Sequence, residues 1–460
     1  MPEQWNADSI ALGHLAGRTV AIEAVLGVND DDVRSAGEVG GFIEVVVERV
    51  APAVTAPSPA ERVDTRRGSH AGDRFSRGNT IPAVAVPHGF CFVTPATDAT
   101  DARWPYRPFL HDDPQGRRLE AVQFSHQPSP WIGDRGVLQL MPFTGEPVSS
   151  REGRRRWIES GTERARPHEY AAELSGGLAL EVTATSHGAA FRVAGDSEAR
   201  VGFVIDQLDA GGGLDLAADG REFTGWVPAG TADWGNPPRT YFAGRVVGET
   251  AGSGMLDDDG RSAVAGYLEG RGALEVRVAL SFLSAEQARV ALDAELGAQF
   301  TFAQLREALQ TRWDDVLDAV TIPPLETAQH PFLGLADAEN RARIASALYR
   351  LHLYPNTHAE DVPDGDGGTA RRDADPMEPN APDAQVRDGD LMVNNGYWDT
   401  YRTAWPALAL LDPAATGRML DGLLAQWHGG GWMARWSAPG YVDSMVGTSS
   451  DQIFADGLRW

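Results

Sequence analysis

The spacing of apolar residues changes at one point along the chain, and this change limits the possible folds. From about residue 62 to residue 283, short apolar runs such as GVLQLMPF, ARVGFVIDQL and ALEVRVALSFL are separated by Gly, Pro and Asp. Many short strands at close spacing predict an antiparallel β-sandwich. From residue 284, apolar residues recur at helical spacing, as in SAEQARVALDAEL and TFAQLREALQTRWDDVLDAV. We therefore predict a sandwich followed by a helical region.

Local signals mark the ends of several helices after residue 284. Ser284 is placed as an N-cap, and Glu286 lies in the first turn. The helix predicted over DAENRARIASALYRLHLYP is closed by Pro355. PALALLDPAATGRMLDGLLAQWH gives two more helices, separated at Pro413. The last residues, SSDQIFADGLRW, continue a helical pattern without a cap, so we expect the helical region to be truncated there.

Two segments are harder to place in this division. Residues 1–60 alternate apolar runs with acidic turns and end in APAVTAPSPAER, which predicts a few strands followed by a linker. Residues 359–390 are rich in Asp, Pro and Gly, and we interpret them as a solvated loop, with a lid over a site as the alternative. They do not form an EF-hand, because Gly368 stands where the third acidic ligand is needed.

Charge and composition exclude several classes of function. A formal net charge of −25 repels phosphate backbones and anionic lipid surfaces, so we expect neither a nucleic-acid partner nor membrane insertion. All 40 basic residues are arginine, which excludes Schiff-base and P-loop lysines. The single cysteine, Cys91, excludes an intramolecular disulfide, and we interpret it as a buried, inert thiol. No signal peptide is recognisable at the N-terminus. We expect a monomer.

The stretch NNGYWDTYRTAWP, residues 394–406, combines the groups that a sugar-binding wall requires. Aromatic rings cover the C–H face of a sugar, and charged groups bind its hydroxyls. We predict that Asp399 accepts hydrogen bonds from hydroxyls, that Arg402 holds Asp399 or binds hydroxyls itself, and that Trp398 packs on the ring. The alternatives are an ordinary ion pair at a helix start for the two charged residues and a core position for Trp398.

This stretch, followed by GGGWMARWSAPGYVDSMVGTSSDQIFAD, resembles glycoside hydrolase family 92, the calcium-dependent exo-acting α-mannosidases. Three further stretches resemble blocks of the same family in the same order: RGNTIPAVAVPHGFCFVTPAT, FSHQPSPWIGDRGVLQLMPFTGE and SALYRLHLYPN. The sequence departs from the family where FSH continues as QPSPWIGD and where NNGYWDT replaces the commoner Phe-Ser-x-Trp-Asp-Thr. These departures indicate a subgroup, in which the leaving-group side is the place to expect a difference.

The resemblance implies an N-terminal β-sandwich packed against a C-terminal (α/α)6 barrel, with the site at their junction. From the resemblance together with the change from strand-like to helical spacing, we divide the chain into an N-terminal extension of uncertain fold (1–60), the β-sandwich domain (61–283), linker helices (284–330) and a partial (α/α)6 catalytic domain (331–460). The resemblance also implies an extracellular enzyme that releases terminal α-linked mannose from glycans, with a mannosyl-phosphate-mannose diester as a variant substrate. A non-catalytic carbohydrate-binding protein and another (α/α)6 enzyme, such as a glucoside phosphorylase, are the alternatives.

The implied mechanism is inverting, with acid and base carboxyl groups about 6.5–9.5 Å apart, and with Ca²⁺ holding the mannose hydroxyls. The acid, the base and most calcium ligands are expected beyond Trp460, so no residue is assigned to these roles. Further candidates for sugar contact are His126 and Trp131 in FSHQPSPWIGD, and Trp104 in RWPY. Trp432 and Trp436 follow a Gly-Gly-Gly turn, and each is interpreted as a pocket lip or a core residue.

Overall fold

The structure is a computed structural model that describes residues 57–72, 75–107, 117–229, 238–257, 265–321, 337–377, 385–447 and 449–459. The predicted strands before residue 57 lie outside the described residues. The chain divides into two compact units, residues 1–57 with 323–341 and residues 58–322 with 342–460. The second unit holds every described element except the beginning of helix α5.

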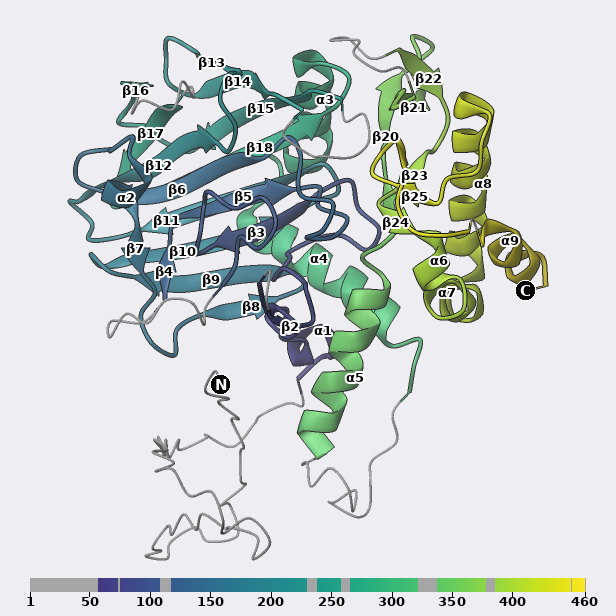
Figure 1. Cartoon of the computed structure of the whole chain (residues 1–460). Helices are drawn as coiled ribbons and strands as arrows, with labels where there is room; N and C mark the ends of the chain where they lie inside the picture. The colour runs from purple at the N-terminus through teal and green to yellow at the C-terminus, as the bar shows by residue number, and fades with distance from the viewer. Residues whose placement is uncertain are drawn as a thin grey trace, which may run out of the picture. The chain divides into compact units, whose positions relative to one another are not determined.

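Two antiparallel sheets form the β-rich part of this unit (Figure 1). The larger sheet consists, in spatial order, of β13 (Gly213–Leu216), β14 (Glu222–Val227), β15 (Thr240–Val247), β18 (Ala273–Ser281), β11 (Gly188–Ala194), β10 (Leu178–Ala184), β9 (Glu169–Leu174) and β8 (Arg164–Arg166). The smaller sheet consists of β16 (Gly252–Leu256), β17 (Ala265–Arg271), β12 (Arg200–Gln207), β6 (Leu138–Thr144), β5 (Ala121–Ser125) and β3 (Phe92–Ala96). This arrangement confirms the predicted β-rich region.

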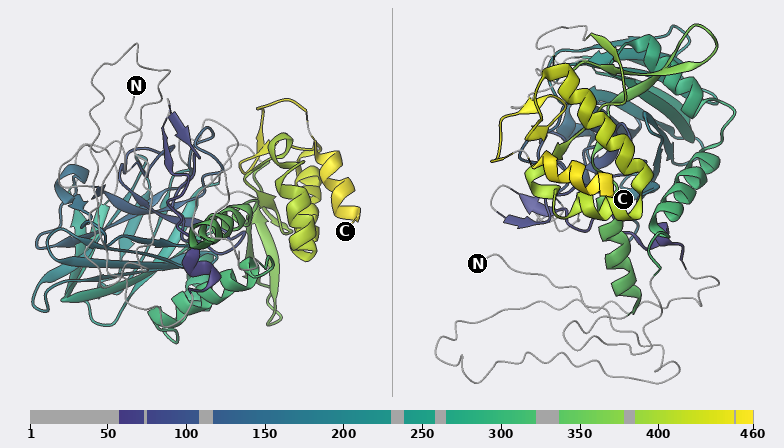
Figure 2. Two further views of the ribbon diagram at one scale, coloured as in Figure 1. Left: turned by 90° about the horizontal axis from the view of Figure 1, so that it is seen from below. Right: turned by 90° about the vertical axis from the view of Figure 1, so that its right-hand side faces the viewer.

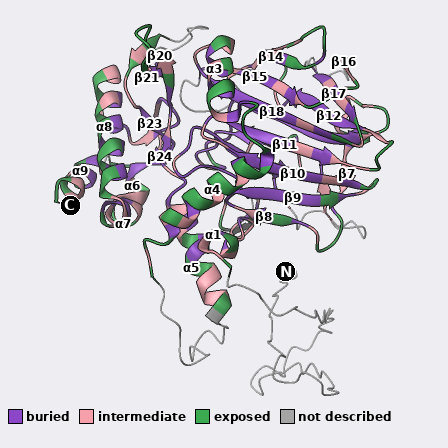
Figure 3. Ribbon diagram, turned by 180° about the vertical axis from the view of Figure 1, so that it is seen from behind, coloured by how far each residue is buried: buried purple, intermediate pink, exposed green. Residues whose placement is uncertain are grey.

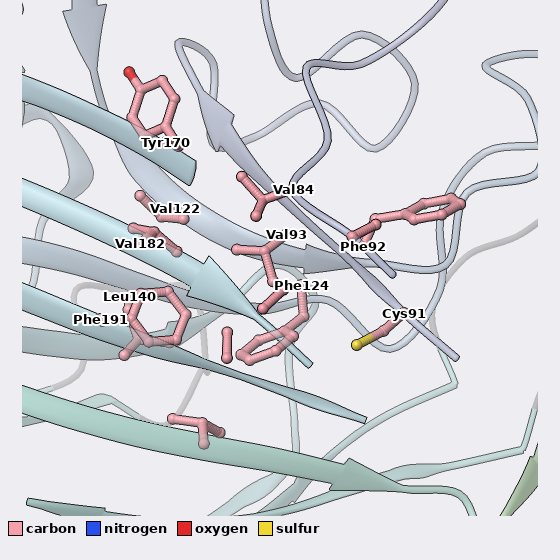
Figure 4. Close-up of a cluster of buried hydrophobic side chains, with 14 of the residues drawn as sticks. Val84, Cys91, Phe92, Val93, Val122, Phe124, Leu140, Tyr170, Val182 and Phe191 are labelled. Atoms are coloured by element: carbon pink, nitrogen blue, oxygen red, sulfur yellow. The ribbon is translucent and has the colours of Figure 1, made fainter. Parts of the chain in front are cut away.

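Apolar side chains from both sheets form one shared core (Figure 4). Successive residues of a strand point to opposite faces, so inward residues of the two sheets meet between them. Val182 and Phe191 come from the larger sheet, and Phe124 and Leu140 come from the smaller one. Cys91 belongs to the same core, and its burial raises the pKa of its thiol. Its prediction as a buried thiol is confirmed.

Helix α3 (Ala285–Leu296) and the beginning of α4 (Phe302–Leu317) cover the larger sheet on the side away from the shared core (Figures 1 and 3). Leu309, Trp313 and Leu317 of α4 belong to the shared core itself. The Ser284 hydroxyl accepts a hydrogen bond from the Gln287 amide at 3.0 Å, so the predicted N-cap is confirmed. Alanines 190, 243 and 279 on the sheet let α3 approach closely, because short side chains keep the backbones near one another.

The helical part contains α5 (Asp337–Leu351), α6 (Tyr397–Thr400), α7 (Ala404–Leu411), α8 (Pro413–Gly430) and α9 (Ser450–Arg459). The predicted separation of two helices at Pro413 is confirmed, and the Asp412 carboxylate caps α8 by accepting from the Ala415 amide at 2.8 Å. Trp405, Met419 and Ile453 share a second core, and α8 and α9 lie side by side (Figure 2). The (α/α)6 barrel and the truncation stay predictions.

The prediction of a solvated loop is wrong for the described part of residues 359–390. The segment forms a three-stranded sheet of β20 (Ala359–Pro363), β21 (Thr369–Ala374) and β22 (Val386–Asp388). Opposite charges face each other across the strands, with Asp361 to Arg371 at 3.3 Å and Asp388 to Arg372 at 3.1 Å. Such cross-strand pairs support a sheet without a continuous apolar pattern. The Asp364 carboxylate closes the hairpin by accepting two backbone N–H groups of the turn.

Short strands join the sandwich region to the helical part. Strand β19 (Asn356–Thr357) pairs with β23 (Met392–Val393), and β24 (Asn395–Gly396) pairs with β25 (Trp436–Ser437), which pairs with β26 (Tyr441–Val442). The remaining elements are α1 (Pro59–Arg62), α2 (Arg151–Arg154), β1 (His70–Gly72), β2 (Phe75–Arg77), β4 (Arg118–Leu119) and β7 (Arg156–Trp157). Among the described helices, none has both the length and the apolarity needed to cross a membrane.

Candidate functional site

The loop between β5 and β6 is held together from inside by one buried carboxylate. Asp134 Oδ1 accepts hydrogen bonds from the backbone N–H groups of His126 and Arg135, each at 2.8 Å. Burial raises the pKa of Asp134 to about 6, although its hydrogen bonds and the neighbouring Arg135 act in the opposite direction. The loop that carries two of the predicted site residues, His126 and Trp131, is therefore closed at its base.

A buried polar contact joins this loop to the stretch that begins at Asn394. The Arg135 guanidinium donates to the His126 carbonyl at 3.1 Å and to Asn394 Oδ1 at 3.0 Å. The Asn394 amide donates to Asn356 Oδ1 at 3.0 Å and to the His126 carbonyl at 3.3 Å. Asn394 adopts a φ of 64°, a left-handed conformation that asparagine tolerates better than most residues. We call Arg135, Asn356 and Asn394 the polar junction.

The turn after Asn394 depends on a close approach between Gly396 and Trp436. A Cβ atom at Gly396 would lie 2.1 Å from a ring carbon of Trp436, so only glycine fits beneath this ring. Strands β24 and β25 pair through the same two residues. Trp436 also packs against a small apolar cluster of Ile132, Ala438 and Val442. Because Ile132 follows Trp131, this cluster brings the sandwich loop against the β25–β26 hairpin.

Asp399 and Trp398 lie on the single turn of α6, next to the polar junction in sequence. Asp399 is exposed, and desolvation by its surroundings raises the pKa of its carboxyl group. Trp398 is half-buried, and its indole N–H is buried without a hydrogen-bond partner among the described residues. A buried donor without an acceptor is costly, so a ligand oxygen would stabilise it. These two groups could serve a sugar, as the sequence predicted.

The expected contact between Asp399 and Arg402 is not formed, so that part of the prediction is wrong. The Arg402 guanidinium instead lies 4.8 Å from the centre of the Tyr401 ring, a cation–π distance. Helix α6 ends at Thr400, and the backbone turns at Thr403, with φ of −131° and ψ of −82°. The two residues therefore do not share the continuous helix that brings positions i and i+3 together.

His126 lies in the interior and not on an accessible surface. Only 1% of the residue is exposed, and its ring centre lies 5.0 Å from that of Phe282 and 5.8 Å from that of Phe90. Burial and, to a smaller extent, the nearby Arg135 lower the pKa of His126 to about 3, so the ring is neutral. Nδ1 lies 3.2 Å from the Arg135 carbonyl and donates to it, which leaves Nε2 buried without a partner among the described residues. Direct contact of this ring with a sugar stays a prediction.

Two tryptophans of the prediction, Trp104 and Trp131, meet edge to face. Their ring centres are 5.3 Å apart, with planes at 86°. Trp104 is buried and donates its indole N–H to Asn79 Oδ1 at 3.2 Å, whereas Trp131 is 54% exposed. Trp432 is 74% exposed, and its backbone N–H donates to the Tyr441 hydroxyl at 3.0 Å. Trp131 and Trp432 thus present ring surfaces that a sugar could cover.

The polar junction is the part of the site that sequence reasoning missed. Asn394 and the paired asparagine after it belong to the stretch that drew attention, and Asn356 follows Pro355 in another block. Neither residue signals a long-range partner, because an asparagine side chain is as common in turns as in buried contacts. The one sequence feature that could have indicated the polar junction is the presence of two asparagines beside aromatic residues in the stretch 394–406.

The described residues do not build a calcium site by themselves. Among them, no group of three or more His, Cys, Asp or Glu side chains is arranged to hold a metal ion. Calcium prefers six to eight oxygen ligands, several of them carboxylates. No step of a reaction is therefore assigned to a metal through these residues.

Comparison with known protein families identifies the family of this chain. Residues 62–312 match the glycosyl hydrolase family 92 N-terminal domain, and residues 287–459 match the glycosyl hydrolase family 92 catalytic domain. The chain belongs to glycoside hydrolase family 92. Both domains of the family are thus represented, in the order that the sequence motifs indicated. No curated protein sequence matches the chain.

Solved structures of this family share the fold. The family GH92 inverting mannosidase BT2199 from Bacteroides thetaiotaomicron VPI-5482 is 25% identical with a TM-score of 0.78, over 88% of this chain and 53% of that protein. The family GH92 α-mannosidase BT3965 from Bacteroides thetaiotaomicron is 19% identical with a TM-score of 0.66, over 88% of this chain and 55% of that protein. Its complex with mannoimidazole gives a TM-score of 0.67 at 19% identity, over 87% of this chain and 52% of that protein. The chain therefore spans about half the length of these relatives.

Proposed function

We propose that this family 92 chain acts in the release of a terminal α-linked mannose from a glycan, with inversion at the anomeric carbon. The observation that supports the proposal is the arrangement of Trp398 and Asp399 beside a polar junction that ties them to the Trp131 loop. The exposed carboxylate of Asp399 can accept hydrogen bonds from the hydroxyls of a pyranose. The half-buried ring of Trp398 and the exposed ring of Trp131 can pack on its C–H groups. The relatives include an inverting mannosidase and a mannosidase bound to mannoimidazole.

In this proposal Asp399 accepts hydrogen bonds from two hydroxyls of the terminal mannose. Its carboxylate forms no ion pair with Arg402, so its oxygens are free to accept from a ligand. Charge-assisted hydrogen bonds of this kind contribute about 1.5–3 kcal/mol each. Trp398 packs on the sugar and donates its free N–H, and Arg402 binds a hydroxyl from its position over Tyr401. The exposed rings of Trp131 and Trp432 form the surrounding aromatic surface, with Trp104 behind Trp131 and Trp436 packed against Ile132. His126 supports the loop from the interior.

Inversion requires an acid and a base on opposite faces of the ring, about 6.5–9.5 Å apart to admit water. We assign neither role to a described residue. Calcium is part of the proposal as a hard cation that binds vicinal hydroxyl oxygens. A mannosyl-phosphate-mannose diester is the variant substrate, because a phosphate leaving group needs little protonation.

The test is hydrolysis of an aryl α-mannoside, with the anomer of the released mannose followed by NMR. We expect β-mannose as the first product, loss of activity in EDTA and recovery with Ca²⁺. Full activity after prolonged treatment with EDTA would remove calcium from the proposal. Release of α-mannose would exclude inversion.

A carbohydrate-binding role without catalysis is the second candidate, favoured by the exposed rings of Trp131 and Trp432, which can bind a sugar without any reaction. Calorimetry with mannoimidazole separates the two. Binding without hydrolysis by the 460-residue chain supports the second candidate, and binding with hydrolysis supports the first.

A further inference from the structure

A pocket of about 250 Å³ lies between the turns of the sandwich and the helical part, away from the residues of the candidate sugar site. Its wall combines Val86 to Gly89, the β10–β11 turn, and side chains from α3, α4, β21 and α8. Its charged and titratable lining is His88, His187, Glu295, Arg312, Asp361, Arg371, Asp390 and Arg418. The lining thus holds three arginines and three carboxylates.

The first acidic group of the pocket is already paired. Glu295 Oε1 lies 2.6 Å from His187 Nδ1, and Oε2 accepts from the His187 backbone N–H at 3.0 Å. Burial opposes charge on the His187 ring, but the Glu295 carboxylate outweighs it and raises the pKa of His187. Both oxygens of Glu295 bond His187, and neither forms a hydrogen bond or an ion pair with Arg312 or Arg418.

The other two acidic groups are paired with one arginine. The Arg371 guanidinium donates to Asp390 Oδ1 at 2.8 Å and to Asp361 Oδ1 at 3.3 Å. Thr357 adds a hydrogen bond from its hydroxyl to Asp390 at 3.2 Å. Arg371 thus bonds one oxygen of each aspartate, and neither aspartate forms a hydrogen bond or an ion pair with Arg312 or Arg418.

Arg312 and Arg418 are left without a partner. Neither forms a hydrogen bond or an ion pair with any described residue, and both line the pocket. Arg312 is exposed, yet desolvation lowers the pKa of its guanidinium. The Glu295 carboxylate acts in the opposite direction, and the positive charge of Arg418 adds to the lowering. Two like charges held near each other are unfavourable. A small anion between them would relieve this repulsion, and guanidinium groups match the geometry of oxyanions.

The pocket and the polar junction lie on opposite faces of the β19–β23 pair. Thr357 and Met392 are partners in this pair, and both line the pocket. Asn356, the neighbour of Thr357, bonds Asn394 in the polar junction. Since successive residues of a strand point to opposite faces, an anion in the pocket would not occupy the sugar site. It would, however, be separated from that site by only one strand pair.

We propose that this pocket binds a small oxyanion between the guanidinium groups of Arg312 and Arg418. The ligand is inorganic phosphate or the phosphate group of a phosphorylated sugar, since both present the same acceptor oxygens. The proposal is independent of the mannosidase function, because none of the residues that line the pocket is assigned to the sugar site.

Titration calorimetry of the 460-residue chain with inorganic phosphate, and separately with mannose 6-phosphate, tests the proposal at constant ionic strength. We expect Arg418→Gln and Arg312→Gln each to weaken binding at least about tenfold, since each removes charge-assisted hydrogen bonds to the anion. The matched control is Arg289→Gln, which removes the same charge from an exposed position on α3 outside the pocket. It should bind as the unmodified chain does.

The two ligands distinguish the two sources. Equal affinity for both identifies a site for the phosphate group alone, and tighter binding of mannose 6-phosphate identifies a phosphorylated sugar. Equal loss in the control and in the two pocket variants would overturn the proposal, because it would show a general effect of charge. Absence of binding of either ligand at millimolar concentration would overturn it as well. Arg312 and Arg418 lie on different helices, so a folding defect in one variant leaves the other as a test.

Discussion

Arg135 and Asn394 are buried and bonded to each other, whereas Asp399, a few residues further along the chain, is exposed and its side chain has no partner among the described residues. The polar junction and the turn at Asp399 therefore have different roles. The polar junction fixes the path of the backbone, because its donors and acceptors have no access to water and must find each other. The turn at Asp399 is positioned by that junction but keeps its own polar groups available. Substitutions in the first region should change stability, and those in the second should change function.

The largest expected effect is that of Arg135→Met. This change removes the donor to the His126 carbonyl and to Asn394 Oδ1, and leaves Asp134 buried without its cationic neighbour. Breaking a buried contact of this kind costs about 3–5 kcal/mol. Urea denaturation should show the loss as a lower midpoint. Arg402→Met is the control, since an exposed substitution changes stability by less than about 0.5 kcal/mol. Equal losses in both variants would remove the distinction between the two regions.

Gly396→Ala should cause the second-largest loss of stability. The added methyl group would lie 2.1 Å from the Trp436 ring, so the ring or the strand must move, at a cost of up to about 3 kcal/mol. The control is Gly417→Ala in α8, where the new methyl group meets no atom within 4 Å apart from its chain neighbours and the backbone of its own helix. There we expect a gain of about 0.5–1 kcal/mol, because alanine favours the helix. Thermal melting of both variants checks the sign of each change.

Asp399→Asn tests whether the turn at Asp399 serves substrate binding. It keeps the shape and removes the charge, so kcat/KM on an aryl α-mannoside should fall about 10- to 100-fold, or about 1.4–2.7 kcal/mol. The free energy of unfolding should stay within about 0.5 kcal/mol, because the residue is exposed. Near-normal kinetics, or a collapse of the melting temperature, would assign this turn to structure.

The smallest expected effect is a change of stability with pH. It comes from the buried contact between His187 and Glu295, whose groups titrate. His187 bonds Glu295 and also contacts the Ala359 carbonyl at 3.2 Å, on β20. The raised pKa of His187 means that this stability is present below its usual value of about 6.5 and is lost as pH rises through the folded value. The lowered pKa of Glu295 gives stability above about 4.5 that is lost on acidification. Melting temperature should therefore decline above neutral pH, and His187→Gln should abolish that decline.

Sequence predicted the features that local chemistry controls. Ser284 caps a helix through groups three residues apart, and Pro413 begins a helix because of its own ring, so both could be located without the structure. The aromatic and acidic content of the Asp399 turn was visible for the same reason. The family blocks supplied the order of the two domains.

The features that sequence missed depend on distant partners. Arg135 reaches Asn394 across 259 positions of the chain, and neither residue indicates this contact. Residues 359–390 were misread because their strands are held by charge pairs such as Asp361 with Arg371, whose pattern looks like that of a solvated loop. The Asp399–Arg402 contact failed because a break in the helix cannot be read from spacing alone.

The edge-to-face pair of Trp104 and Trp131 gives the molecule a built-in optical probe. Two indoles with centres 5.3 Å apart and planes at 86° are close enough for their electronic transitions to couple, which produces a paired positive and negative band in circular dichroism. Trp104 is fixed by its hydrogen bond to Asn79, so only the exposed ring of Trp131 can alter the coupling. A sugar that settles on Trp131 would change the sign or height of this band, and binding could be followed without a label or a chromogenic substrate.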